Sequence, residues 1–249
     1  MVERCPEHRR LLCALASRHD DGLRDSPAAR AGWMGQPVRM RLSPVISGFA
    51  IAFAVSYPLL RRRILTWGAT DWEASAGMPG DELLADADGV STRAITIDAP
   101  ISSVWPWLAQ MGPSPRGGAY TYDWIENLLG LDMHSVDRVL PEFQHPAVGD
   151  TFSLGSNQMR LARVEPEHVI CWRSQDANWI WTFVLDEHDG GTRLISRNRF
   201  RLPTLVARLG MLPMEPGSLV MERKMLLGIK ERAERLASSQ VRDQSLPSR

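Results

Sequence analysis

Residues that could carry acid–base chemistry gather between positions 123 and 137. His134 and Asp137 are three positions apart, and Asp123 and Asp132 precede them in the sequence. An enzyme that closes a ring through a carbanion needs a general base beside a carbonyl group. His134 and Asp137 are therefore the catalytic candidates of this chain, although solvated residues on a loop between elements are the commoner explanation of such a pair.

The sequence lacks the residue patterns that other forms of catalysis require. His168 and Cys171 are three positions apart on a predicted strand, so their side chains point to opposite faces and cannot act as base and nucleophile. The sequence contains no G-x-S-x-G, no phosphate-binding Gly loop and no H-E-x-x-H. Its three cysteines, Cys5, Cys13 and Cys171, match neither a disulfide framework nor a zinc site. We predict no cofactor and no metal.

Aromatic residues with polar tips follow a Gly-rich loop at 112–118. Tyr120, Tyr122, Asp123 and Trp124 are of the types that line the mouth of an apolar pocket. The alternative is that they pack a short helix onto a sheet.

A second set of candidates lies on two predicted strands. Alternation places Trp179, Trp181 and Phe183 on one face of their strand, and Asn198 faces inward on the last strand. A buried amide needs hydrogen-bond partners, which are either protein groups or a ligand. The predicted ligand-binding residues are Trp105, Tyr120, Tyr122, Asp123, Trp124, Trp179, Trp181 and Asn198.

The elements that position these residues form an α+β plan. A strand at 92–98 precedes a helix near 100–111 and a shorter one at 120–131. Period-two alternation and turn residues then predict five antiparallel strands, at 150–154, 159–165, 168–174, 179–186 and 192–202. The last strand carries arginines on its other face, which must be solvated or paired. After a Met/Pro/Gly bend at 211–217, Ser218 is the expected N-cap of a terminal helix with the apolar stripe Met221, Met225, Ile229, Ala233 and Leu236.

The N-terminal quarter of the chain has a different character. Residues 1–41 form a poorly patterned basic arm, and residues 42–60 contain no charge and are followed by Arg61, Arg62 and Arg63. That length predicts a transmembrane helix, with the C-terminal domain on the cytoplasmic side. A buried or surface-lying helix in a soluble cytoplasmic protein is the alternative.

The charges are divided unevenly along the chain. Of 29 basic and 29 acidic residues, positions 1–63 hold eleven and five, which leaves 18 basic and 24 acidic residues in the remainder. An acidic folded part argues against nucleic acid as a partner.

Residues 64–202 resemble the bacterial branch of the START-like (SRPBCC) superfamily, which includes polyketide cyclases, dehydrases and lipid-transport proteins. The resemblance rests on Trp67–Thr70, Met78–Asp81, Thr92–Ile95, Ala99-Pro100, Val104–Leu108, Gln110–Gly112, Arg116–Gly118, Tyr120–Asp123 and Val148–Asp150. It implies a helix-grip fold, in which a curved antiparallel sheet of about six strands wraps a long C-terminal helix and leaves a deep apolar pocket. The domain is then expected at 64–239, after a hydrophobic segment at 42–63 and before a flexible tail at 240–249.

The expected function is non-covalent binding, with possible carriage, of a lipid-like or polyketide-like molecule near a membrane. One alternative is a cyclase or dehydrase acting in the same cavity, and another is an interaction domain whose pocket is filled by side chains. Two neighbouring inward titratable groups would favour catalysis, a wide apolar cavity would favour carriage, and a collapsed cavity would favour the interaction domain.

Overall fold

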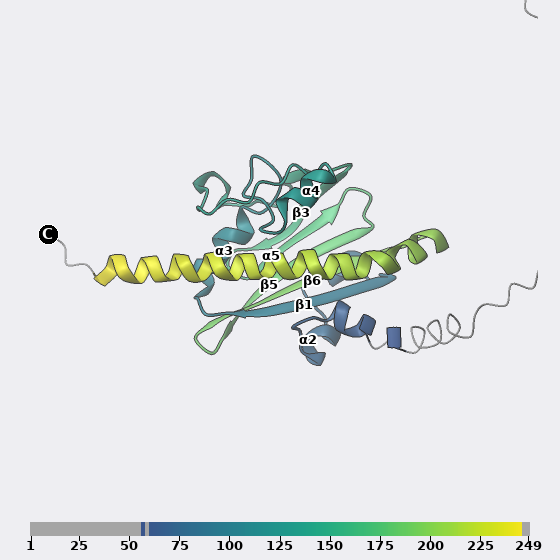
Figure 1. Ribbon diagram of the computed structural model, residues 1–249, viewed down its shortest axis with the longest axis horizontal. Coiled ribbons are helices and arrows are strands. Elements are labelled where there is room, and N and C mark those ends of the chain that lie inside the picture. The colour runs from purple at the N-terminus through teal and green to yellow at the C-terminus, as the bar shows by residue number, and fades with distance from the viewer. Residues whose placement is uncertain (1–55, 58–59, 246–249) are drawn as a thin grey trace, which may run out of the picture. The chain divides into compact units, whose positions relative to one another are not determined.

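The computed structural model describes residues 56–57 and 60–245, and it confirms the predicted α+β helix-grip fold (Figure 1). Six antiparallel strands form one sheet in the order β1-β6-β5-β4-β3-β2. The strands are β1 (Gly89–Ile97), β2 (Thr151–Leu154), β3 (Asn157–Glu165), β4 (Val169–Ser174), β5 (Trp179–His188) and β6 (Gly191–Phe200). The helices are α2 (Asp71–Ser75), α3 (Ile101–Ala109), α4 (Asp123–Leu128) and α5 (Leu205–Ser245), with short 3₁₀ turns η1 (Asp81–Leu84) and η2 (Pro141–Phe143).

The core lies between one face of the sheet, α3 and α5. Figure 1 shows the long helix α5 lying across one face of the sheet. The predicted stripe of α5 supplies Met225, Ile229 and Ala233 to this core, where they are buried with Phe183 and Trp172 of the sheet. Apolar burial of this kind is the main favourable term in folding.

The predicted start of the terminal helix is wrong. α5 begins at Leu205 rather than at Ser218, and it runs through Pro213 and Pro216. Each proline removes a backbone donor and crowds the preceding turn, at a cost of about 3 kcal/mol, and the ribbon bends near this end of α5 (Figure 1). A tertiary contact anchors this segment: Arg61 donates two hydrogen bonds from Nε and one from Nη2 to the Glu215 carboxylate, at 2.7–3.0 Å.

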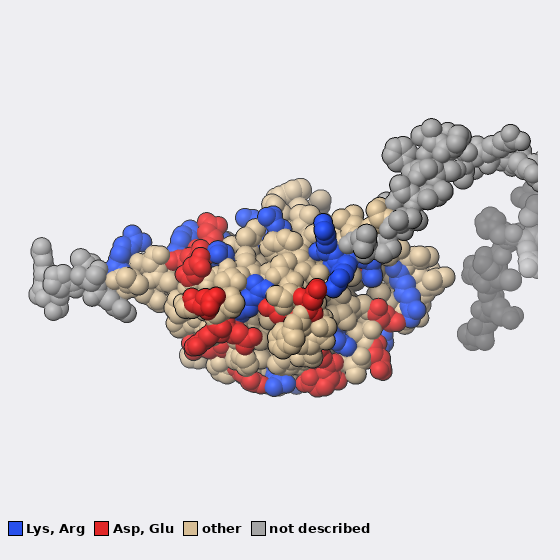
Figure 2. All heavy atoms as spheres, turned by 90° about the horizontal axis from the view of Figure 1, so that it is seen from below, with Lys and Arg blue, Asp and Glu red and all other residues tan. Residues whose placement is uncertain are grey.

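The arginines on the outer face of β6 are paired, which settles the choice that the sequence left open. Arg193 donates from Nε and Nη2 to the two carboxylate oxygens of Glu73 at 2.7 and 2.8 Å. Arg197 donates to Asp81 Oδ2 at 2.7 Å, and Arg199 donates to the Leu84 carbonyl at 3.0 Å. Residues 71–88 therefore cover the face of the sheet that lies opposite α5. Figure 2 shows basic and acidic side chains interspersed on the molecular face seen from below.

The predicted transmembrane segment at 42–60 lies outside the described residues, except for residues 56, 57 and 60. Among the residues that are described, no helix combines the length and the apolar composition that a membrane crossing requires. The predicted basic arm at 1–41 also lies outside them.

The Glu73–Arg193 pair makes stability depend on pH. The hydrogen bonds from Arg193 lower the pKa of Glu73 from 4.5 to about 2. Because the folded-state pKa is depressed, this contribution is present above the unfolded-state pKa and is lost as the pH falls from about 4.5 towards 2. We expect the free energy of unfolding to fall by about 2–3 kcal/mol across that window through this group alone.

Urea denaturation at a series of pH values checks this expectation. Glu73→Gln should be less stable at neutral pH and should lose part of the pH dependence, whereas Glu187→Gln, at an exposed position of β5, should behave as wild type. Identical pH profiles for the Glu73→Gln variant and the wild type would contradict the account.

Candidate functional site

A buried ion pair joins the first strand to the terminal helix inside the grip. Arg93 lies on the face of β1 that is directed at α5, and its guanidinium pairs with the Glu222 carboxylate. The same guanidinium donates to Ser218 Oγ at 3.0 Å and to the Ile64 carbonyl at 3.1 Å. Arg93 has no exposed surface and Glu222 is 8% exposed. The ion pair therefore connects β1, α5 and the helical residues 60–65 in a region with little access to water.

Glu222 also receives hydrogen bonds from β6. Ser196 Oγ donates to Glu222 Oε1 at 2.6 Å, and Asn198 Nδ2 lies 3.3 and 3.4 Å from the two carboxylate oxygens. Burial raises the pKa of Glu222, and the charge of Arg93 together with the hydrogen bond from Ser196 opposes that rise. A buried ion pair is tolerated only when its remaining donors and acceptors are satisfied, and here both partners have several.

Two tryptophan side chains extend this polar network towards the solvent. Trp179 Nε1 donates to Asn198 Oδ1 at 2.9 Å, and Trp181 Nε1 donates to Ser196 Oγ at 3.1 Å. Trp179 stacks on Trp181 and on Phe200, in each case with ring centroids 5.8 Å apart and planes 19° apart. All three are half-buried. We call Trp179, Trp181 and Phe200 the aromatic ladder. Its two indole N–H groups are held by protein partners, and each of its side chains keeps some accessible surface.

The structure brings together three of the predicted ligand-binding residues, Trp179, Trp181 and Asn198. The predicted inward orientation of Asn198 is observed, and its side-chain amide has protein partners at both ends. Trp105 lies in the core between α3, α5 and the sheet. A ligand-binding role for each of these residues stays a prediction.

The other predicted residues lie in and just before α4, and Tyr120 belongs to the core cluster against which Trp179 and Trp181 pack. Tyr120 is buried, its hydroxyl donates to the Trp107 carbonyl at 3.0 Å, and the Arg232 guanidinium lies 4.8 Å from its ring centroid. The Asp123 carboxylate accepts from the backbone N–H of Ser135 at 2.7 Å and from its hydroxyl at 2.6 Å.

Two further predicted residues lie at the surface. Tyr122 is 38% exposed and Trp124 is 69% exposed.

The two catalytic candidates have separate environments. Asp137 pairs with Arg232 at 2.8 Å and with Arg235 at 3.3 Å. His134 is exposed, and its Nδ1 lies 3.5 Å from both Asp132 Oδ1 and Ser114 Oγ. A Ser-His-Asp relay uses the two different nitrogens of the imidazole ring. Because both neighbours of His134 lie at the same nitrogen, this arrangement does not have the geometry of a catalytic triad.

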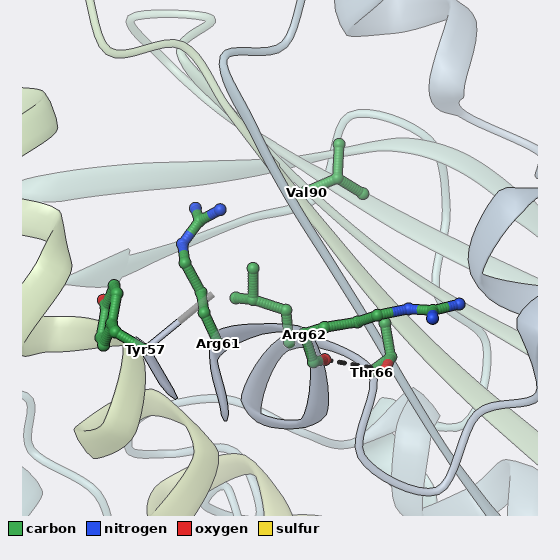
Figure 3. A pocket seen from close by; sticks show the side chains of 6 residues that line it. Tyr57, Arg61, Arg62, Thr66 and Val90 are labelled. Atoms are coloured by element: carbon green, nitrogen blue, oxygen red, sulfur yellow. Dashed lines mark hydrogen bonds between the residues drawn. The ribbon is translucent and has the colours of Figure 1, made fainter. Parts of the chain in front are cut away.

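Among the hollows on the described part of the molecule, one borders β1 and another borders β2. The first has a volume of about 440 Å³ and is lined by Tyr57, Arg61, Arg62, Leu65, Thr66 and Val90. Figure 3 shows Tyr57 and Arg61 on the side of α5, with Val90 of β1 across from them. The second has a volume of about 400 Å³ and lies beside β2. No residue of the aromatic ladder lines either hollow, and apolar side chains occupy the space between α3, α5 and the sheet.

Sequence reasoning missed the two charged residues at the centre of the network. Arg93 shares a strand face with Ile95 and Ile97, and Glu222 lies one helical turn before Leu226. A single charge on each of two apolar faces that must meet predicts a buried ion pair. These two isolated charges were the feature of the sequence from which the ion pair could have been predicted.

Comparison with known proteins finds only distant structural similarity. No family model matches the chain, and no curated protein matches it. Protein MLL2253 from Mesorhizobium loti is 16% identical over 59% of this chain and 98% of its own, with a TM-score of 0.37. The Polyketide_cyc-like protein Cgl2372 from Corynebacterium glutamicum is 16% identical over 63% and 93%, with a TM-score of 0.31. Aha1 from Colwellia psychrerythraea is 14% identical over 59% and 96%, with a TM-score of 0.36. Similarity at this level carries no argument about function.

The buried ion pair predicts a characteristic pattern of mutational effects. Glu222→Ala should lower the free energy of unfolding by about 3–5 kcal/mol, because it leaves the Arg93 charge buried and unpaired. The double variant Arg93→Met/Glu222→Leu should recover much of that loss, since apolar residues need no compensating charge.

Urea denaturation of the two single variants and the double variant measures the coupling between Arg93 and Glu222. Glu231→Ala, which removes an exposed carboxylate 4.0 Å from Arg235 on the same helix, serves as control and should change stability by less than about 1 kcal/mol. Additive effects of the Arg93 and Glu222 substitutions would contradict the assignment.

Proposed function

We propose that this protein binds a hydrophobic small molecule non-covalently against the aromatic ladder of Trp179, Trp181 and Phe200. The observation that carries the proposal is the combination of stacked, half-buried rings with indole N–H groups that are already hydrogen-bonded inside the protein. A ligand that approaches the ladder then meets apolar ring surface, and both indole donors are already hydrogen-bonded inside the protein.

The chemistry of these rings favours flat or extended apolar ligands. Aromatic contacts contribute about 0.5–1.5 kcal/mol per pair beyond the burial of area. The bonds to Ser196 and Asn198 fix the ring orientations before a ligand arrives, which reduces the entropy lost on binding. The resemblance of residues 64–202 to a superfamily of lipid-binding and polyketide-binding proteins points to the same ligand class.

The packing of the interior determines how a ligand would lie. Because apolar side chains occupy the space between α3, α5 and the sheet, we propose binding on the accessible side of the ladder. Deeper entry would require core side chains to move. The filled interior favours the interaction-domain alternative over carriage of a fully enclosed lipid, and binding of a ligand at this accessible side is compatible with such an interior.

Among the described residues, Arg93 and Glu222 are two neighbouring inward titratable groups near the ladder, and Glu222 is the one that could act as a base in catalysis of the cyclase or dehydrase type. Its oxygens receive hydrogen bonds from Ser196 and Asn198 and the charge of Arg93. A general base must reach the proton that it abstracts. Since protein groups occupy this carboxylate, the geometry supports binding in preference to catalysis.

Association with a membrane through residues 42–60 is a separate proposal that rests on the uncharged run in the sequence. Flotation with lipid vesicles of chains with and without these residues would test it, and equal flotation of the two would overturn it.

Substitution of a ladder residue tests the proposed function. Titration with N-phenyl-1-naphthylamine, a neutral apolar fluorophore, should show saturable binding to the wild type. Trp181→Ala should weaken that binding by about tenfold, as removal of a central aromatic contact usually does, and Trp181→Phe should restore part of it.

The matched control is Trp72→Ala, which removes a tryptophan that is 75% exposed on α2. It should bind the fluorophore as the wild type does. Equal affinities for the Trp181→Ala and Trp72→Ala variants, or the absence of saturable binding to the wild type, would overturn the proposal.

A further inference from the structure

We propose that the hollow beside β2 is a separate binding site for a small molecule that carries a carboxylate or phosphate group. This hollow, of about 400 Å³, lies where the loop at 113–116 and residues 130–132 meet Phe143 and the strand β2. Its volume falls in the range of known small-molecule sites. It is lined by Pro113, Ser114, Pro115, Arg116, Leu131, Asp132, Phe143, Thr151, Phe152 and Ser153, and by two glycines.

Arg116 is the residue that would bind the acidic group. Its Nε donates to the Met111 carbonyl at 3.0 Å and its Nη2 donates to the Ala109 carbonyl at 2.6 Å. Those bonds hold the guanidinium at the end of α3. Within the part of the chain that the structure describes, Nη1 of Arg116 makes no hydrogen bond, and no carboxylate lies within 4.0 Å of the guanidinium.

The surroundings of this guanidinium are apolar. Its central carbon lies 4.8 Å from the Phe143 ring centroid and 5.7 Å from that of Trp172. Burial lowers the pKa of Arg116, and the negative charge of Asp150 opposes that shift. A partly desolvated cation without a contacting counter-ion is energetically unfavourable. An anion in the hollow would supply the missing partner.

The remaining walls of the hollow define the ligand further. Arginine is suited to planar, two-point recognition of carboxylate and phosphate groups, and the hydroxyls of Ser114, Thr151 and Ser153 offer additional donors. Phe143 and Phe152 would contact an apolar body. The Asp132 carboxylate also lines the hollow, with His134 3.5 Å away. Its negative charge favours a ligand with one acidic group over a polyanion.

The site is distinct from the aromatic ladder. The ladder lies on β5 and β6, whereas the hollow borders β2, and β3 and β4 separate these strands in the sheet. The two sites share no residue. An experiment can therefore distinguish loss of binding in the hollow from loss of binding at the ladder.

Calorimetric titration of the full chain with three eight-carbon probes tests the proposal. Octanoate and octyl phosphate should bind, and octan-1-ol, which has the same apolar body without the charge, should bind at least about tenfold more weakly. Arg116→Gln should reduce the affinity for the two anions by about tenfold and leave the affinity for the alcohol nearly unchanged.

The matched control is Arg232→Gln. Arg232 also lies over an aromatic ring and donates to two backbone carbonyls, but it contacts the carboxylate of Asp137. This variant should bind the anions as the wild type does. Because Arg116 also supports the end of α3, Ser153→Trp provides a second test: it fills the hollow from an exposed position of β2, leaves Arg116 in place and should abolish anion binding.

Three results would overturn the proposal. The first is equal affinity for the anions and the alcohol. The second is anion binding that survives both Arg116→Gln and Ser153→Trp. The third is anion binding that is lost in Trp181→Ala, which would assign it to the ladder.

Discussion

The ion pair between Arg93 and Glu222 is the interaction on which the rest of this domain depends. It lies where the first strand, the last strand, the terminal helix and the helical residues before the sheet all meet. Removing two charges from water costs several kcal/mol per ion, so the pair is stable only with a nearly complete set of hydrogen bonds. Ser218 of α5 supplies one of them.

The aromatic ladder is a consequence of the same network. Ser196 and Asn198 each donate to the Glu222 carboxylate and each accept an indole N–H. The carboxylate therefore orients two polar side chains, and these orient two tryptophan rings. A surface fixed in this way is preorganised for apolar ligands. The outer face of the sheet is organised independently, by pairs such as Arg193–Glu73.

Local sequence patterns predicted the elements and the strand faces, but they did not predict the long-range contacts. Alternation was sufficient to place Trp179, Trp181 and Asn198 on the inner face, because the side-chain period of a strand is fixed by its backbone. The start of α5 was mispredicted because Pro213 and Pro216 disfavour helix locally, whereas the helix of the assembled fold continues through both. Arg93 and Glu222 are 129 positions apart, so their pairing depends on the assembled fold. The role of Arg116 likewise depends on which loops meet at β2.

The claim that this domain binds a hydrophobic molecule is tested most directly by native mass spectrometry of the full chain purified from its host. The account predicts a bound species of low mass, present at close to one per chain and released by organic extraction, and it predicts that Trp181→Ala is purified with less of it. A wild-type chain that carries no such species, and that acquires none from an extract of host lipids, would contradict the account.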